Sequence, residues 1–358
     1  MAFNAQPFNG QLLQNEIYTA IYNLIIGQQV FSDIVKGTYG SLADLFKTEG
    51  SMYGDIKLFY SVQLGHVEDW TNDNEASNLL ALNRPADPNC QAVKIDQFKK
   101  IWLTIDNFMS KRAFGTEGVF AQFNSVILGT LRDTKRVYEA KLMNVSVGTM
   151  ETSIGEQTKT ITLGEVTDEA TARVEAQTIA KEIADIFVDL KDVSADYNDL
   201  GYERSYDDSD FVVVWNADYY NKITKLDLPT IFHNDNLIDK LGQYVLPAKY
   251  FGTVSTATTS VAGARSTKEQ KIGDKWYRPG DVVDTGSSVA SGDTYTENAK
   301  VICKIIHKDA IKYMSGFETM TEFYNPRSLT QNHYLIFGYS DPKASRLAEF
   351  PFITVKSN

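Results

Sequence analysis

The chain has 358 residues, of which 35 are basic and 46 acidic, and a formal net charge of −11. This balance favours solubility and argues against a protein that binds nucleic acid over its whole surface. Cys90 and Cys303 match no zinc or redox spacing, and the apolar runs are far too short to span a bilayer, so we expect free thiols, no membrane partner and a soluble protein made in the cytoplasm.

Residues 1–52 are expected to form an arm that carries one short helix. Ile17 and Ile21 stand at helical spacing, whereas aromatic residues such as Phe8 are too dispersed to build a core alone. The arm would therefore bury its apolar stripe against another surface. Phe8, Ile17 and Ile21 are candidate contacts between subunits of an assembly.

Two alternating apolar runs, at 53–64 and 92–105, predict a long two-stranded β projection. The polar segment between them contains Trp70 and Arg84 and forms an irregular tip. An isolated ribbon of this kind is marginal in water unless another surface covers it. It packs either on its own domain or on a partner subunit, and in the second case Trp70 and Arg84 are candidate contacts.

Residues 117–144 predict the longest helix, with an apolar stripe on one side and a basic face on the other. Arg132, Lys135 and Arg136 lie on the basic face. A phosphate-facing surface and a solvated helix face both fit this pattern, and the solvated face is the commoner explanation.

The next segment predicts a packed α/β unit. A short strand pair is expected at 152–166, followed by an amphipathic helix at 167–190 that Thr167 caps. After an acidic loop at 192–210, the apolar run that begins at Phe211 stops at a capping Asn216 and restarts at helical spacing. This pattern predicts a buried strand followed by a helix.

The composition then shifts toward loops. A helix is expected at 236–244, and the Ser/Thr/Gly-rich stretches 253–267 and 284–296 are expected on the surface because they cannot hold a core. Between them, Trp276 and Tyr277 form either a turn stabilised by aromatic packing or a platform for stacking a sugar ring. Further strands are predicted at 301–307, 334–338 and 350–355.

The search for chemistry finds no catalytic, cofactor-binding or metal site. The four histidines share no ligand spacing, and the sequence has no Gly-rich phosphate loop, no phosphate-binding lysine motif and no nucleophile elbow. We therefore predict that the protein is not an enzyme. A divergent α/β active site remains the alternative, and a pocket of convergent polar groups would identify it.

The order of elements, with Val-Val-Val-Trp-Asn-Ala at 212–217 and His-Lys-Asp-Ala-Ile at 307–311, resembles the HK97-fold major capsid proteins of tailed bacteriophages. The resemblance covers nearly the whole chain. It implies an α+β, HK97-like capsid fold with an N-terminal arm, an extended β-hairpin loop, a spine-helix peripheral domain and an axial domain. The implied segments are the arm at 1–52, the extended β loop at 53–108, the peripheral domain with its spine helix at 109–226, the axial domain with surface loops at 227–309 and the C-terminal return strands at 310–358.

The resemblance also implies a function and partners. The chain would self-assemble as hexamers and pentamers into the icosahedral shell of a virion, formed in the host cytoplasm around double-stranded DNA held by non-specific proximity. Separate scaffolding, portal or decoration proteins are expected. Some family members begin with a long scaffolding helix that this chain lacks, which implies a separate scaffold or earlier cleavage. The covalent crosslinking known in part of the family is not assigned to a particular Lys and Asn in this sequence.

Within such a shell, the basic helix face has two interpretations. Arg132, Lys135 and Arg136 either line the lumen and contact phosphates, or pair with the acidic loop 192–210 of the same or a neighbouring subunit. We favour pairing, because the loop is present before any DNA arrives. Two other functions stay open: an encapsulin-like compartment that encloses a cargo enzyme, and a monomeric carbohydrate-binding or adhesion module built on Trp276 and Tyr277.

Overall fold

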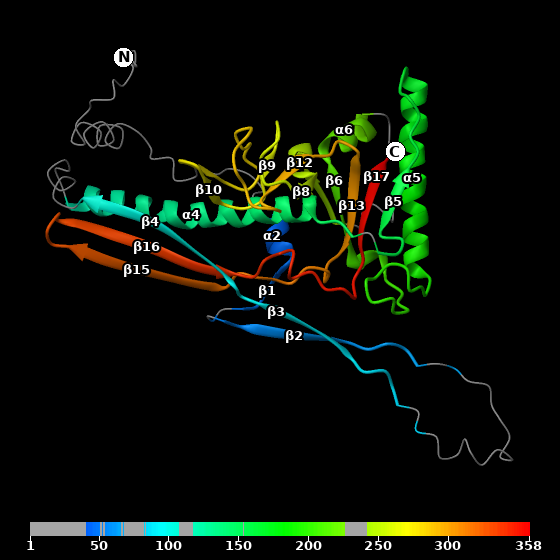
Figure 1. Cartoon of the computed structure of the whole chain (residues 1–358), viewed down its shortest axis with the longest axis horizontal. Coiled ribbons are helices and arrows are strands. Elements are labelled where there is room, and N and C mark those ends of the chain that lie inside the picture. Colours follow the sequence, from blue (N-terminus) through cyan, green and yellow to red (C-terminus); the bar gives the residue numbers. More distant parts are fainter. Residues whose placement is uncertain are drawn as a thin grey trace.

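The long helix α4 (Glu117–Thr149) extends outward from a central β-sheet, and a second sheet lies beside it (Figure 1). A two-stranded ribbon projects from the same body. The computed structural model shows this α+β arrangement for residues 41–50, 52, 54–65, 67, 82, 84–106, 117–152, 154–225 and 242–358. Most of the expected arm lies outside the described residues.

The central sheet is mixed and five-stranded, with the order β5-β17-β13-β6-β7. β13 is antiparallel to β17 and β6, whereas the outer strands β5 and β7 run parallel to their neighbours. Every residue of β13 is buried, as expected for a strand covered on both faces. The strands are β5 (Thr158–Ile161), β6 (Phe211–Asn216), β7 (Gly242–Leu246), β13 (Val301–His307) and β17 (Phe352–Ser357).

Two helices cover the two faces of this sheet. On one face, the apolar stripe of α5 (Glu169–Lys191) shares a core cluster with Phe211 and Val213 of β6. On the other face, the last turns of α4 share a core cluster with Val212 and Val214. Because alternate residues of β6 feed two different cores, its sequence is a continuous apolar run. The predicted strand and the helix that follows it, α6 (Ala217–Lys225), are confirmed.

The second sheet runs along α4 and has the order β15-β16-β4. We expected the whole run 92–105 to extend the projection. Instead, β4 (Gln97–Asp106) pairs with β16 (Thr330–Tyr339) over its full length. β15 (Phe317–Asn325), which the sequence did not predict, completes the sheet as the other partner of β16.

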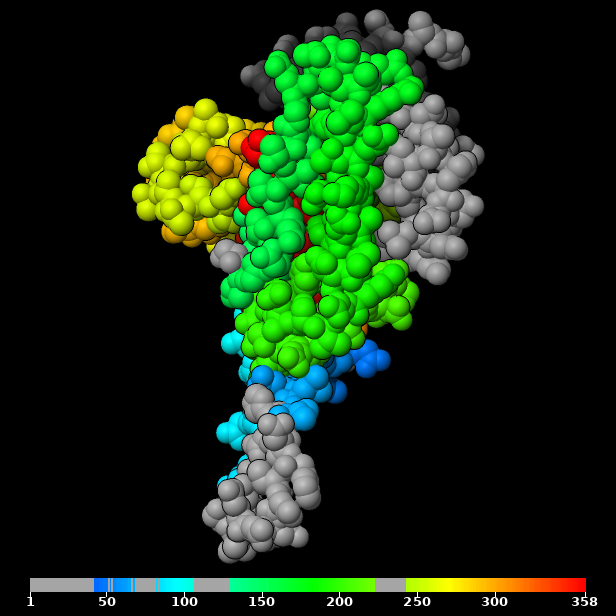
Figure 2. Space-filling view, turned by 90° about the vertical axis from the view of Figure 1, so that its right-hand side faces the viewer, coloured from blue at the N-terminus to red at the C-terminus, as the bar shows by residue number. Residues whose placement is uncertain are grey.

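The two-stranded ribbon consists of β2 (Ile56–Ser61) and β3 (Asn89–Lys94), which pair antiparallel from Ile56 with Lys94 to Ser61 with Asn89. The predicted projection is therefore confirmed for these two strands. Figure 2, which views the molecule from the side of α5, shows the ribbon emerging below the body.

The Ser/Thr/Gly-rich region stands out to one side of the body (Figure 2). Our expectation that it lacks a core is wrong, because Ala264 and Tyr295 are fully buried there. A small sheet closes over them, and the Tyr295 hydroxyl donates a hydrogen bond of 2.8 Å to the Lys249 carbonyl. Its strands are β8 (Gly252–Ser255), β9 (Arg265–Ser266) and β12 (Thr294–Glu297), and a hairpin of β10 (Gln270–Ile272) and β11 (Lys275–Tyr277) lies beside them.

Three local expectations need correction. Residues 152–166 contribute the single strand β5, paired with β17, rather than a strand pair. Asp168, not Thr167, caps α5, because its carboxylate accepts a hydrogen bond of 2.8 Å from the Thr171 backbone N–H. Of the helix expected at 236–244, residues 236–241 lie outside the described residues, and residues 242–244 belong to strand β7 rather than to a helix. The remaining short elements are α2 (Ser41–Leu45), β1 (Lys47–Thr48), η1 (Asp208–Asp210), η3 (Ala248–Tyr250) and β14 (Tyr313–Met314).

Candidate assembly surface

The ribbon carries an exposed row of apolar side chains on the side turned away from the body. Alternate residues of a strand point to opposite faces, so Leu58 and Tyr60 share one face of β2 with Ile56. Val62 and Leu64, just beyond the strand, are also apolar and exposed, and each of the five side chains is between 51% and 62% exposed. A row of this kind is typical of a surface that another protein covers. We call it the ribbon outer face, and it comprises Ile56, Leu58, Tyr60, Val62 and Leu64.

The opposite face of the ribbon packs on its own subunit. Val93 of β3 belongs to a buried cluster with Met314 and Leu347, and Phe59 of β2 packs against that cluster. Of the two hypotheses for the projection, packing on its own domain thus holds for one face. The body fixes the ribbon from one side and leaves the ribbon outer face free for another surface.

A second exposed apolar surface lies on the three-stranded sheet. Trp102 of β4 and Phe323 of β15 are 59% and 61% exposed. Phe98 packs edge-on against Phe317 with ring centroids 5.9 Å apart, and the Lys100 ammonium lies 5.6 Å from the Trp102 ring centroid. α4 packs on this sheet through Tyr138, whose ring lies edge-on to Phe337 of β16.

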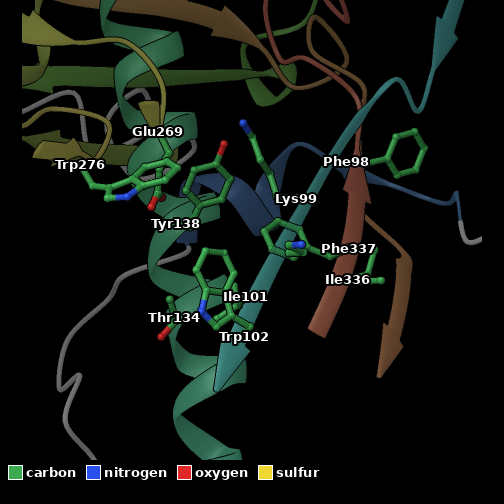
Figure 3. Close-up of a pocket in the computed structure, with 11 residues that line it drawn as sticks. Phe98, Lys99, Ile101, Trp102, Thr134, Tyr138, Glu269, Trp276, Ile336 and Phe337 are labelled. Carbon is green, nitrogen blue, oxygen red and sulfur yellow. The ribbon is translucent and has the colours of Figure 1, made fainter. Parts of the chain in front are cut away.

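A cavity of about 640 Å³ opens between α4, β4 and the β10–β11 hairpin (Figure 3). Trp276 reaches toward it from the hairpin, Tyr138 from α4 and Trp102 from β4. Trp276 is 62% exposed, whereas Tyr277 is buried and packs with Val283. The two neighbouring aromatic residues therefore do not form a joint stacking platform, and Tyr277 stabilises the turn.

Lys135 belongs to the interior of the subunit rather than to its surface. Its ammonium donates a hydrogen bond of 2.7 Å to Glu318 of β15 and lies 3.8 Å from Glu139 one helical turn away. Burial raises the pKa of Glu139, and the nearby Lys135 charge opposes that shift. These contacts tie α4 to the three-stranded sheet.

The remaining candidate contact residues divide into exposed ones and ones that the structure does not describe. Arg84, Arg132 and Arg136 are exposed. The acidic loop pairs elsewhere: Asp208 lies 2.6 Å from Lys191, and Asp199 pairs with Arg346. Among the described residues no ion pair joins this loop to the basic helix face, and for Lys135 the expected pairing is replaced by Glu318 and Glu139. Outside the described residues lie Phe8, Ile17, Ile21 and Trp70.

The buried titratable group Lys304 is held by contacts inside the subunit. Lys304 of β13 is fully buried, its ammonium donates to the Met150 carbonyl just beyond α4, and it lies 5.4 Å from the Phe352 ring centroid. Burial lowers its pKa to about 7, against a weaker opposing effect of Glu151. In the described part of the chain, no group of three or more potential ligand residues is placed to hold a metal ion, and no helix is long and apolar enough to cross a membrane.

The sequence-based search missed the residues that anchor the ribbon. On the ribbon, the Ser61 hydroxyl donates to Glu349, the Val62 carbonyl accepts from Arg204, and the Gln91 side chain accepts from the Ala348 backbone N–H. These partners are separated by more than a hundred positions, so no local spacing marks them. The alternating pattern of β2 was the one signal that could have identified the ribbon outer face.

A family model and two solved structures match the chain. The family model for the Phi29-like phage major capsid protein matches residues 3–339. The capsid structure of Staphylococcus phage Andhra contains a chain with 15% identity and a TM-score of 0.62, covering 93% of this chain and 87% of that one. A chain in the solved structure of the head fiber and inner core protein of native bacteriophage P68 has 14% identity and a TM-score of 0.60, with 99% and 90% covered.

No curated protein matches the sequence. The two structural likenesses, at these identities, establish the α+β fold of phage capsid structures, and the family match spans nearly the whole chain. The chain therefore belongs to the Phi29-like phage major capsid protein family and is a structural component of the phage capsid shell.

Proposed function

We propose that the chain forms the hexamers and pentamers of an icosahedral shell around double-stranded DNA, and that its role is structural rather than catalytic. The observation that carries the proposal is the ribbon outer face, where five apolar side chains on one projection are each more than half exposed. Such a surface is unfavourable in water and is covered when neighbouring subunits pack on it in a closed lattice. Each contact can be weak, because closure of the shell adds many of them.

The proposal includes partners and a place of assembly. Shells form in the host cytoplasm with separate scaffolding, portal or decoration proteins, and the DNA lies near the inner wall without base-specific contacts. The net charge of −11 supports this last point, because strong attraction to the shell would hinder movement of the packaged DNA.

The proposed division of labour follows the segments expected from the sequence. Residues 1–52 serve as the arm and 53–108 as the extended loop, while 109–226 form the peripheral domain around α4. Residues 227–309 contribute the axial domain near the centre of each capsomer. The return strands at 310–358 tie these parts together through β16 and β17.

Electron microscopy of the expressed chain tests the proposal. The parent is expected to form closed shells, and Leu58→Asp is expected to leave soluble subunits with the thermal stability of the unassembled parent, because it places a charge in the ribbon outer face. Val174→Asp, at a residue of α5 that is 60% exposed, is the matched control and should assemble. Closed shells from Leu58→Asp, or equal loss of assembly in both variants, would contradict the role of the ribbon.

An encapsulin-like compartment is the alternative that shares the fold. The contents of purified particles decide between the two, because a genome shell encloses nucleic acid and a compartment encloses a cargo protein. A monomeric sugar-binding module has less support, since Trp276 stands without Tyr277 beside it.

A further inference from the structure

Polar contacts hold the far end of the ribbon against its own subunit. Glu349 uses both carboxylate oxygens: Oε2 accepts a hydrogen bond of 2.6 Å from the Ser61 hydroxyl, and Oε1 accepts bonds of 3.1 and 3.0 Å from the Arg204 guanidinium. Arg204 Nη2 also donates a 2.6 Å bond to the Val62 carbonyl, the first residue beyond β2. The Arg204 guanidinium therefore reaches the ribbon directly at Val62 and, through Glu349, indirectly at Ser61.

The other strand of the ribbon is held at the same level. The side-chain amide of Gln91 donates to the Arg346 carbonyl and accepts a 3.0 Å bond from the Ala348 backbone N–H. The segment that supplies these groups is itself fixed from behind, because Asp199 donates its backbone N–H to the Ala348 carbonyl and pairs with Arg346. We call Ser61, Gln91, Arg204 and Glu349 the ribbon latch.

The latch lies at the last part of the ribbon that contacts the body. Between Val62 and Asn89, every described side chain is exposed. The apolar packing of Phe59 and Val93 holds the near part of the ribbon, but apolar contacts are non-directional and fix its angle weakly. Charge-assisted hydrogen bonds are directional, and the Arg204 and Glu349 side chains are only 20% and 22% exposed, so solvent screens their pair incompletely.

We propose that the ribbon latch fixes the angle at which the ribbon leaves the subunit and thereby selects the size of the shell. This inference rests on the proposed function, in which the ribbon meets a neighbouring subunit. A rotation at the latch moves residues further along the ribbon by an amount that grows with distance. Because every copy in a shell repeats the same contact, a fixed angle gives one curvature and a loose angle gives several.

Distance measurements on unassembled subunits test the angle directly. Cys90 is exposed on β3 and Cys303 is fully buried, so a nitroxide label attaches at Cys90. A second label at Val174→Cys on α5 reports the ribbon against the body by double electron–electron resonance. Without a latch substitution, this doubly labelled chain should give one narrow distance distribution, and Glu349→Gln and Arg204→Met, each added to it, should broaden the distribution.

Lys356→Met is the matched control, because it breaks a pair with Glu151 whose side chains are exposed to 21% and 27%, on a strand away from the ribbon. It should leave the distribution narrow. If Arg204→Met fails to fold, Glu349→Gln still decides the question, since it keeps the shape of the side chain while it removes the charge and one of the two acceptor oxygens.

Electron microscopy of the same variants without labels tests the consequence for the shell. The parent and Lys356→Met should give one size of particle, while Glu349→Gln should give several sizes or open sheets. An unchanged distance distribution in the latch variants overturns the latch, and a broadened distribution with particles of the parental size overturns its role in size selection. The proposed function is tested separately, by Leu58→Asp. Normal shells from that variant would contradict the proposed function and would leave the distance measurement on unassembled subunits unaffected.

Discussion

Replacing Lys304 by Met should stabilise the subunit at pH 6 and remove a pH dependence from its unfolding. The Lys304 ammonium is fully buried in the central sheet, where its hydrogen bond goes to the Met150 carbonyl. Burial lowers its pKa from the ordinary 10.5 to about 7. Methionine has a similar length and no charge, so it fills the same space without an ammonium.

The sign of the effect follows from proton binding. Between pH 7 and 10.5 the unfolded chain holds the Lys304 proton and the folded chain does not, so the free energy of unfolding rises with pH across that window and is flat below it. A tenfold change in proton affinity corresponds to ~1.4 kcal/mol. The lysine therefore destabilises the folded subunit by roughly 5 kcal/mol below pH 7 and by roughly 2 kcal/mol at pH 9.

Methionine removes the destabilisation caused by the buried ammonium but leaves the Met150 carbonyl without its hydrogen-bond donor. A buried acceptor that loses its partner costs about 1–3 kcal/mol. The difference makes Lys304→Met more stable than the parent by roughly 2–4 kcal/mol at pH 6, and brings the two within about 1 kcal/mol of each other at pH 9.

Urea unfolding of unassembled subunits at pH 6 and pH 9 measures these differences. Lys181→Met, at a side chain of α5 that is 73% exposed, is the control and should follow the parent at both pH values. If the parent and Lys304→Met differ by the same amount at pH 6 and pH 9, the lysine proton is not the cause and the reasoning is wrong.

Three further outcomes are expected. Gly148→Ala should destabilise the subunit by about 2 kcal/mol or more in the same unfolding assay, because its Cβ would lie 2.1 Å from the Tyr250 carbonyl oxygen; a neutral result would mean that α4 can move away. Tyr138→Phe and Tyr339→Phe should each cost about 1–2 kcal/mol and the double variant less than their sum, because the two hydroxyls bond each other at 2.5 Å in the core; additive costs would show that the hydroxyls act separately. Deleting residues 1–31 should leave a soluble chain that forms no closed shells under the electron microscope, and normal shells would exclude the arm from assembly.

The sequence predicted best those helices and strands whose apolar pattern depends only on residues within the element itself. β6 and α5 were found because strand burial on both faces and helical periodicity are local properties. The helix α4 was likewise expected, and it runs five residues beyond the expected end at residue 144.

Pairing and long-range packing were the parts that could not be read from spacing. The alternation in β4 gives its buried face but not its partner, so its pairing with β16 was missed. Tyr295 occurs in a polar stretch, and its burial depends on strands far from it in sequence. For the assembly surface, the alternating residues of β2 were visible, whereas the bond between Ser61 and Glu349 joins residues 288 positions apart.

The position of β17 has a consequence for the order of synthesis and folding. This strand, at residues 352–357, pairs with β13 on one side and β5 on the other, so the central sheet stays divided until these residues have been synthesised. Nascent chains still attached to the ribosome therefore lack a complete core, and contacts between residues so far apart form slowly. A chain that stops before residue 352 lacks the strand that joins β13 to β5, so it is not expected to complete the central sheet.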